Sequence, residues 1–440
     1  MMNCIKKITF LILFINFSIS FAQEKLTKEK AVSLALENNY GIKIADNNLK
    51  IAENNKSILN SGYLPTLTGN AGATYNKDNT EAVFANEEVR ILEGAKSNRF
   101  NASLSLNYTL FDGLGRLYNY KQLKEQYNLT ELQARETIEK TLLQLFTVYH
   151  NVALLTENVA LLTQSLKISK DRLTRANYQF DFGQNTKLFV LNAEVDVNND
   201  SISLLNTKQL LLNAKRDLYV VLGKKENPNF YVDTQVNFLI TLNKQQLFEQ
   251  VKTNNVNLLQ IQRGIEISNF QLKANKSGYL PTIGLTTTYG WSKSNNNSAS
   301  FLLESTNTGI STGFNFKWDI FNGGRTRTQV QNAKINYDIQ QLSKKQKELE
   351  ITRDFNNAWE DYRTKLFVFQ TQEKNVQTNT NNFERTKESY KLGQITSIEF
   401  RQAQINLINA QLNLNKAKYE AKNAELKLLQ LTGELLNIEY

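Results

Sequence analysis

The stretch Ser61–Leu67, SGYLPTL, recurs almost unchanged as SGYLPTI at Ser277–Ile283, 216 positions later. The 440-residue sequence holds three prolines, and two of them occupy the same place in these two copies. A proline costs little at a strand entrance, where its missing N–H has no ladder partner to lose. The motif therefore predicts a junction, used twice, at which the glycine ends a helix and the proline begins a strand. The junction residues are Gly62, Pro65, Gly278 and Pro281.

The two junctions belong to a longer internal repeat. LFDGLGR at Leu110–Arg116 matches IFNGGR at Ile320–Arg325, and FGQNT at Phe182–Thr186 matches LGQIT at Leu392–Thr396, both at an offset of 210. Because these anchors keep the same order, we expect one architecture to be written twice. The first repeat is expected at 23–223, the second at 242–440, and an extended linker at 224–241.

The first 22 residues have the pattern of a secretory signal peptide, with Lys6 and Lys7 before an apolar run and Ser20-Phe21-Ala22 at the cleavage site. Its removal leaves 50 Lys+Arg against 42 Asp+Glu, a net charge of +8, and takes away the only cysteine, Cys4. We expect no nucleic-acid partner, because the cations are interspersed singly and the chain is exported. Without disulfides, the exported chain must be held by packing or assembly.

Segments of strict apolar–polar alternation predict four strands. The even-numbered residues from Ala102 to Leu110 are apolar and their odd-numbered neighbours are polar, and Gly309–Ile320 alternates in a similar way. The segments that follow the two prolines alternate more weakly. We expect strands at about 64–77, 99–112, 280–292 and 308–321, with polar connections at 76–98 and 292–307 that project into water.

The remainder of the chain is predicted to be helical. Apolar residues from Leu145 to Leu173 recur at steps of three and four, broken only by Ser169, as in coiled-coil packing. A helix of 67 residues would be roughly 100 Å long at ~1.5 Å per residue. We expect long helices at 116–180 and 325–391, return helices at 187–223 and 397–432, and one helix before each strand pair, the second at 242–277.

Strands of about ten residues have the length of outer-membrane strands. No later segment approaches the ~20 apolar residues expected of a spanning helix. A sheet in hydrocarbon must close, because an unpaired edge has no water to bond with, and four strands are too few to close. We therefore expect a barrel shared among copies of the chain. The alternatives are a soluble β-sandwich and a rod-like scaffold without a channel.

The signal peptide, the SGYLPTL and SGYLPTI junctions, the LFDGLGR and IFNGGR strand exits and the GQNT and GQIT turns resemble the TolC family of outer membrane efflux proteins. The resemblance covers essentially all of the mature chain. It implies a mainly α fold with membrane β: a homotrimer with a shared 12-stranded β-barrel, four strands from each chain, in outer membrane lipid, and a periplasmic α-barrel of coiled-coil-like helices. It also implies a passive exit duct with two partners, a periplasmic adaptor protein and an inner-membrane pump, with an RND-type pump favoured over an ABC-type one.

By the same resemblance, the two hairpin tips close the periplasmic entrance and contact the adaptor. A glycine in each tip permits the positive φ of a tight reversal. The alternative is that these glycines form the turn and nothing more. The implied contact residues are Phe182, Gly183, Gln184, Asn185, Thr186, Leu392, Gly393, Gln394, Ile395 and Thr396.

The resemblance also implies a periplasmic gate. Glu399 matches an acidic position that faces the lumen, so a trimer would hold three carboxylates whose repulsion favours dilation or cation binding. Gln402 stands where the relative has a second acid, and Phe189 at the matching site of the first copy. Tyr390 matches a tyrosine that holds the entrance closed, but its arginine partner's position is Ile395, so we expect a weaker or different latch. A solvated surface glutamate remains the alternative for Glu399.

No catalytic, cofactor-binding or metal site is predicted, and we expect the protein not to be an enzyme. The mature chain has no cysteine and one histidine, His150, which is expected to be a packed helix residue. The Gly-x-Gly of FDGLGR lacks the rest of a dinucleotide fingerprint. The cargo stays open between small toxic molecules, drugs included, and secreted polypeptides, and a non-conducting envelope scaffold is a further alternative.

Overall fold

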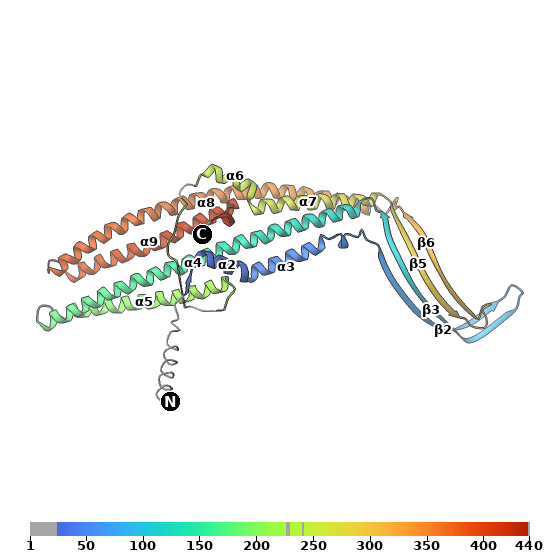
Figure 1. Cartoon of the computed structure of the whole chain (residues 1–440), viewed down its shortest axis with the longest axis horizontal. Coiled ribbons are helices and arrows are strands. Elements are labelled where there is room, and N and C mark those ends of the chain that lie inside the picture. Colours follow the sequence, from blue (N-terminus) through green and yellow to red (C-terminus); the bar gives the residue numbers. More distant parts are fainter. Residues whose placement is uncertain (1–23, 226–228, 240–241, 439–440) are drawn as a thin grey trace, which may run out of the picture. The chain divides into compact units, whose positions relative to one another are not determined.

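The computed structural model describes residues 24–225, 229–239 and 242–438, so the signal peptide expected at residues 1–22 lies outside the described part (Figure 1). The described chain is mostly helical, as expected, with one long antiparallel sheet. Segments distant in sequence come together in two compact units. Unit 1 is Met1–Asp46, Gln133–Leu259 and Lys347–Tyr440, and unit 2 is Asn47–Leu132 and Gln260–Gln346.

The helices and strands follow one another in two similar runs. The first run is β1 (Glu24–Leu26), α2 (Lys28–Asn38), α3 (Tyr40–Asn55), η1 (Ile58–Asn60), β2 (Thr66–Val83), β3 (Val89–Phe111), α4 (Gly115–Asp181) and α5 (Lys187–Val221). The second run is β4 (Phe230–Val232), α6 (Lys244–Asn254), α7 (Val256–Lys276), η2 (Ser277–Tyr279), β5 (Thr282–Asn295), β6 (Glu304–Lys317), α8 (Arg325–Lys391), α9 (Ser397–Thr432) and η3 (Leu435–Asn437). α4 and α8 have 67 residues each.

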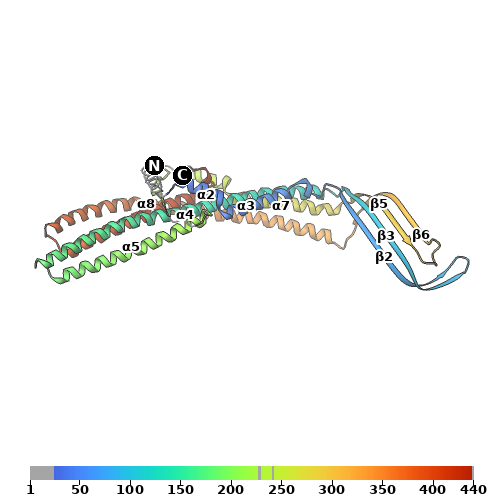
Figure 2. The same cartoon turned by 60° about the horizontal axis from the view of Figure 1, so that its bottom comes forward.

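The long strands of unit 2 form a four-stranded antiparallel sheet in the order β2-β3-β5-β6, and they lie side by side in both views (Figure 1, Figure 2). Residues directly opposite each other share a face of a sheet. Leu104 lies opposite Gly69 and Tyr289, and Tyr289 lies opposite Ile310. The apolar residues of the separate strands therefore form one continuous face.

This apolar face is exposed. Leu67, Leu104, Ile310 and Phe314 are 68%, 51%, 72% and 76% exposed. A soluble sandwich would bury such side chains against a second sheet. The sandwich alternative is therefore wrong for this chain, and the apolar face is left to contact lipid or another molecule.

β2 and β3 run further than the alternation predicts. The expectation of a loop at 76–98 is wrong, because strand pairing continues to Val83 opposite Val89. β5 pairs with β3 only as far as Asn98 opposite Asn295. A hairpin with water on both faces needs no apolar face, so its polar sequence resembles a loop. The β5–β6 connection is shorter and spans 296–303.

The helix expected at 242–277 is divided into α6 and α7 at Asn255. The Asn255 side chain accepts from the N–H groups of Asn257 (3.1 Å) and Leu258 (3.3 Å) and caps α7, while its amide donates to the carbonyl of Leu431 at the end of α9 (2.8 Å). Asn39 divides α2 from α3 in the same way, and its amide donates to the carbonyl of Val221 at the end of α5 (2.8 Å). Each asparagine thus joins a helix start to a distant helix end.

Glycines complete these two joints in unit 1. Gly223 (φ +66°) and Gly433 (φ +75°) follow α5 and α9 in the left-handed conformation. A Cβ on Gly223 would lie 2.3 Å from the carbonyl oxygen of Asn38, and one on Gly433 would lie 2.6 Å from that of Asn254. Both positions therefore require glycine for backbone angle and for space.

The main core of unit 1 lies where α4 passes the short β1–β4 sheet. Phe146, Tyr149 and Leu218 are buried there. The Tyr149 hydroxyl donates to the carbonyl of Leu26 (2.7 Å) and accepts from the N–H of Asp233 (2.9 Å). Burial raises the pKa of Tyr149 to about 12. The described part of the linker is thereby fixed to α4.

By length and composition, α4 is the one helix of the described residues that could cross a membrane, with an 18-residue window of mean hydropathy 1.2. The expectation that no segment approaches this limit is therefore wrong. A third of that window is buried inside the chain, and α4 supplies Leu145, Phe146 and Val152 to the core. Helix packing explains this hydropathy, since core residues are also apolar.

Candidate functional site

The two hairpin tips of unit 1 close with the same backbone motif. Gly183 has φ +68° and donates its N–H to the carbonyl of Phe180 (2.9 Å), and Gly393 has φ +75° and donates to that of Tyr390 (3.1 Å). A left-handed glycine at this position satisfies the last carbonyls of a helix. A methyl group on either glycine would meet no atom within 4 Å, so the backbone of both tips is open.

Some tip side chains turn back onto the hairpins. The Asn185 amide donates to the side-chain oxygen of Gln179 (2.8 Å), and Ile395 packs against a small apolar cluster on α8 and α9. Thr186 and Thr396 occupy the N-cap positions of α5 and α9, and of the two only the Thr396 side chain forms a capping hydrogen bond. The remaining side chains are exposed, and these are Phe182, Gln184, Leu392 and Gln394.

Glu399 has a structural role that the sequence analysis missed. Its carboxylate accepts from the N–H and the hydroxyl of Thr396 (both 2.8 Å), and the Thr396 hydroxyl accepts from the N–H of Glu399 (3.2 Å). This is a capping box at the start of α9, and the spacing Thr-x-x-Glu is its sequence signature. The backbone and hydroxyl bonds from Thr396 lower the pKa of Glu399. Phe189 holds the matching place in α5, where no such box forms.

Tyr390 contacts an arginine from the other hairpin. The Arg175 guanidinium lies 5.1 Å from the centre of the Tyr390 ring and donates to the carbonyl of Lys391 (3.1 Å). The ring also stacks on Phe400, with centres 4.7 Å apart. Gln402 is exposed and donates to Asn406 (2.9 Å). Tyr390 therefore contacts residues of both hairpins, whereas the Gln402 side chain is exposed and bonds within its own helix.

A buried polar cluster joins α4, α5 and α9 near these tips. Arg401 binds Asp200 through two nitrogen–oxygen contacts (2.6 and 2.9 Å), and the Ser169 hydroxyl donates to the same carboxylate (2.6 Å). Asp196 pairs with both Arg172 and Arg401. Although burial raises the pKa of Asp200, the bonds from Arg401 and Ser169 outweigh it, and the pKa lies below its ordinary value. The sequence signal was Ser169, the one break in the apolar series.

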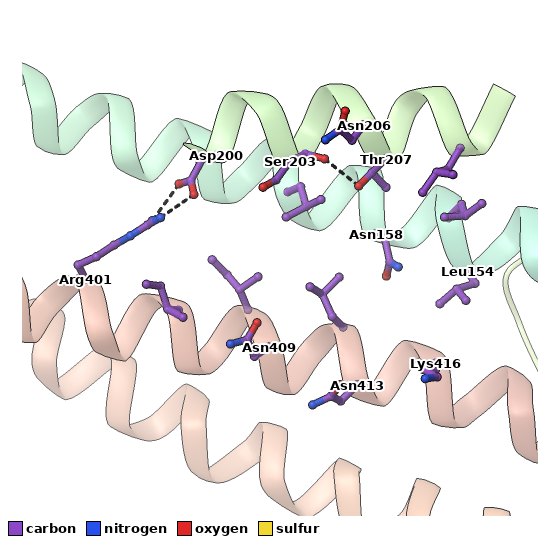
Figure 3. A pocket seen from close by; sticks show the side chains of 16 residues that line it. Leu154, Asn158, Asp200, Ser203, Asn206, Thr207, Arg401, Asn409, Asn413 and Lys416 are labelled. Carbon is purple, nitrogen blue, oxygen red and sulfur yellow. Dashed lines mark hydrogen bonds and ion pairs between the residues drawn. The ribbon is translucent and has the colours of Figure 1, made fainter. Parts of the chain in front are cut away.

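A groove of about 590 Å³ runs between α4, α5 and α9 (Figure 3). The Asp200–Arg401 pair crosses the groove from α5 to α9. Seven leucine and isoleucine side chains line the groove together with uncharged amides, which both donate and accept hydrogen bonds. The amide side chains that line it are Asn158, Asn206, Asn409 and Asn413.

The four junction residues shape the backbone of unit 2 where a helix is followed by a strand. Gly62 has φ +75°, and its carbonyl accepts from Arg116 (3.1 Å). Gly278 lies inside η2, where a Cβ would come within 3.2 Å of the Thr326 side chain. Pro65 and Pro281 stand immediately before β2 and β5.

Aromatic side chains flank the apolar face of the sheet at both ends. Outer-membrane strands carry such girdles at the two membrane interfaces, with an apolar band between them. The face is therefore built like a lipid-facing surface. On the helix side the girdle contains Phe316 and also Trp318, which follows β6, and on the side of the hairpin turns it contains Phe100 and Trp291.

His150 is buried beside Tyr419 in the core of unit 1, and its Nδ1 lies 2.6 Å from the side-chain oxygen of Asn423. Burial lowers the pKa of His150 to about 4. Among the residues that the structure describes, no group of three or more His, Cys, Asp or Glu side chains is placed to hold a metal ion.

The model of the outer membrane efflux protein family matches residues 31–224 and 247–434. The chain belongs to the outer membrane efflux protein family. The resemblance to the TolC family is thereby confirmed. This is a family of channel proteins, and it assigns the chain to the outer membrane as an efflux channel.

Several characterised relatives of this efflux protein span most of its length. The outer membrane efflux protein BepC of Brucella suis is 22% identical over 418 residues, which cover 92% of this chain and 85% of BepC. The outer membrane protein TolC of Escherichia coli is 23% identical over 397 residues, 85% of this chain and 76% of TolC. The alkaline protease secretion protein AprF of Pseudomonas aeruginosa is 21% identical over 416 residues, 91% of this chain and 83% of AprF.

The fold is that of a solved outer membrane channel. The CmeC channel of Campylobacter jejuni superimposes with a TM-score of 0.76 at 19% identity, covering 93% of this chain and 86% of CmeC. The efflux protein is accordingly assigned to the outer membrane, with its helical part in the periplasm.

Proposed function

We propose that the protein is the exit duct of a tripartite efflux system and that it works as a homotrimer. The observation that carries the proposal is the sheet β2-β3-β5-β6, in which β2 and β6 are edge strands and one face is apolar. An open edge in hydrocarbon is costly. In three copies, each β6 would pair antiparallel with β2 of the next chain, which closes a barrel of twelve strands.

We infer that the chain arose by internal duplication. The two runs contain the same elements in the same order, with α2 and α6 of 11 residues each and α4 and α8 of 67 residues each. The match of one family model to two successive ranges supports this inference.

The hairpin tips are proposed to bind a periplasmic adaptor, which links the duct to an inner-membrane pump of the RND type or, as the alternative, the ABC type. Open backbone and exposed apolar side chains at Phe182 and Leu392 support this role. The mature chain has no cysteine, so single cysteines at Gln184 or Gln394 should crosslink to the adaptor in whole cells. A cysteine at Lys345, an exposed residue of unit 2, is the control.

The gate is proposed to lie at Tyr390, Glu399 and Gln402. In a trimer, three Glu399 carboxylates would form an acidic ring while each also caps its own α9. The Arg175–Tyr390 contact is proposed to take the place of the latch that Ile395 cannot make. We expect Tyr390→Ala to raise the conductance of the resting channel. We expect Glu399→Gln to lower its preference for cations.

The cargo is proposed to be small toxic molecules, drugs included. The similarity to AprF, a secretion protein, favours secreted polypeptides as a second candidate. Growth of a deletion strain on a panel of toxic compounds, together with a survey of its culture medium for missing proteins, separates the two. Restored resistance from the wild-type gene supports small molecules, and restored secretion alone supports polypeptides.

The decisive experiment is native mass measurement of the detergent-extracted protein, followed by conductance in planar bilayers. A trimer with steady ionic conductance is expected. A monomer would contradict the shared barrel. A sealed trimer, silent even with Tyr390→Phe and Glu399→Ala, would favour the non-conducting scaffold.

A further inference from the structure

A groove with three cationic side chains lies beside the helix end of the long sheet in unit 2. It runs between α7 and α8 in unit 2 and has a volume of about 510 Å³. Lys276 stands on α7, and Arg327 and Lys334 stand on one face of α8. Asp338 is the one acid that lines the groove, so the lining carries a net charge of +2.

These cations are free to bind a ligand. Within residues 24–225, 229–239 and 242–438, none of Lys276, Arg327 and Lys334 makes an ion pair, a hydrogen bond or a ring contact, and all three are exposed. Most other basic side chains near the two junctions have partners. Arg116, for example, pairs with Asp112 (3.2 Å) and stacks over Tyr63.

The groove adjoins the girdle of the apolar face. The Trp318 indole N–H donates to the carbonyl of Tyr279, which lines the groove (3.2 Å). Trp318 directly follows Lys317, the last residue of β6, and its side chain is half exposed. A molecule in the groove therefore meets cations on one side and the membrane interface on the other.

The matching place in the first run keeps only one of these three charges. The counterparts of Lys276 and Arg327, at offsets of 216 and 210, are Asn60 and Leu117. The counterpart of Lys334 is Lys124, whose ammonium group lies 4.5 Å from the centre of the Tyr120 ring. The repeat as such does not require a basic groove, so the charges need a separate explanation.

We propose that this groove binds the phosphate headgroup of a phospholipid from the periplasmic leaflet of the outer membrane, one per chain. Arginine and lysine are the usual ligands of phosphate. Basic residues at a membrane interface raise affinity for anionic lipid by on the order of fivefold each. Leu272 and Val330 line the same groove and give the start of an acyl chain an apolar contact. The proposal rests on the outer-membrane trimer proposed above.

The test is native mass spectrometry of the full-length protein in detergent, titrated with phosphatidylglycerol. The variant K276Q/R327Q/K334Q should bind the lipid at least about tenfold more weakly than the wild type. The control K124Q/K208Q/K345Q removes the same charge from exposed sites elsewhere and should bind like the wild type. Equal binding by the groove variant and the wild type would overturn the proposal.

Two further experiments distinguish a lipid headgroup from other sources of the anion. If millimolar inorganic phosphate displaces the lipid completely, the groove is a site for free anions and the lipid proposal is wrong. Groove-dependent binding to purified peptidoglycan without groove-dependent lipid binding would overturn it as well. The single variant R327Q gives the same readout if the triple variant does not fold. Trimer mass and conductance of the same preparation show whether the duct itself has failed.

Discussion

Gly223 and Gly183 have nearly the same backbone angle, with φ +66° and +68°, but different surroundings. A methyl group on Gly183 meets nothing within 4 Å, whereas one on Gly223 would lie 2.3 Å from the carbonyl oxygen of Asn38. Gly183→Ala should therefore cost only the left-handed strain, about 1 kcal/mol. Gly223→Ala should cost a further ~1–3 kcal/mol because the backbone must move.

The measurement is the midpoint of thermal unfolding, followed by helical circular dichroism. Gly183→Ala serves as the control for Gly223→Ala. Equal midpoints for the two variants would show that the joint at Asn38 tolerates displacement.

His150 predicts a pH dependence of stability. Its pKa is lowered by burial to about 4, against an ordinary value of 6.5, and Lys28, Lys418 and Lys422 add to the shift. The unfolded chain therefore takes up a proton first as the pH falls. The contribution of His150 to the free energy of unfolding is fully present above about pH 6.5. It is lost as the pH falls to about 4, which lowers the free energy of unfolding by at most ~3 kcal/mol.

The variant His150→Gln keeps a hydrogen-bonding group for Asn423 and cannot titrate in this range. We expect its unfolding midpoint to fall less than that of the wild type between pH 7 and pH 4.5. A parallel decline in both proteins would assign the pH dependence to other groups.

At the scale of elements, the polar cluster of Arg401, Asp200 and Ser169 joins three helices of unit 1. Arg401→Met should destabilise the chain by about 3–5 kcal/mol, because it leaves the buried Asp200 carboxylate without its main partner. The matched control is Arg353→Met, since Arg353 is exposed and pairs with its neighbour Asp354. Exposed pairs contribute roughly 0–1 kcal/mol.

Chemical unfolding of these two variants measures the difference. The double variant Arg401→Met with Asp200→Asn should recover part of the loss, since it removes the unpaired charge. If Arg401→Met were as stable as the control, the cluster would hold the hairpins together no better than a surface pair.

Local sequence patterns were sufficient to predict much of the order of helices and strands. Strand starts next to Pro65 and Pro281 depend on residues close in sequence, and so do the reversals at Gly183 and Gly393. The breaks at Asn39 and Asn255 were not predicted. Their amides bind carbonyls 182 and 176 positions away, and such partners are not visible in a local pattern.

In the candidate site too, features that depend on neighbouring residues were predictable and features that depend on distant partners were not. The capping box of Thr396 and Glu399 spans three residues and could have been predicted from its spacing. Ser169 was noticed as a break, but its partners Asp200 and Arg401 lie 31 and 232 positions away. The role of Tyr390 likewise depends on Arg175, which belongs to the other hairpin.

At the scale of the whole molecule, the two faces of the sheet should respond differently to charge. Leu285 lies on the apolar face opposite Tyr108, and Thr286 lies on the polar face opposite Asn107. Leu285→Arg would place a cation in lipid, at a cost that rises from below about 1 kcal/mol near the interface to about 2–4 kcal/mol at the midplane. Thr286→Arg would place the same charge in the water-filled lumen of the proposed barrel.

We expect Leu285→Arg to lower the amount of trimer in purified outer membranes. Thr286→Arg should assemble normally and reduce the permeability to cations in planar bilayers. If the two variants assembled equally well, the sheet would not be embedded in lipid by this face.

The unequal lengths of the β2–β3 and β5–β6 hairpins have a consequence at the cell surface. In the proposed trimer, tall and short hairpins would alternate around the rim, as three posts separated by three gaps. An antibody or a phage would reach the posts before anything else on the molecule. The Phe84–Glu88 turn, with Glu87 at φ +65°, is consequently the place to insert an epitope that living cells display.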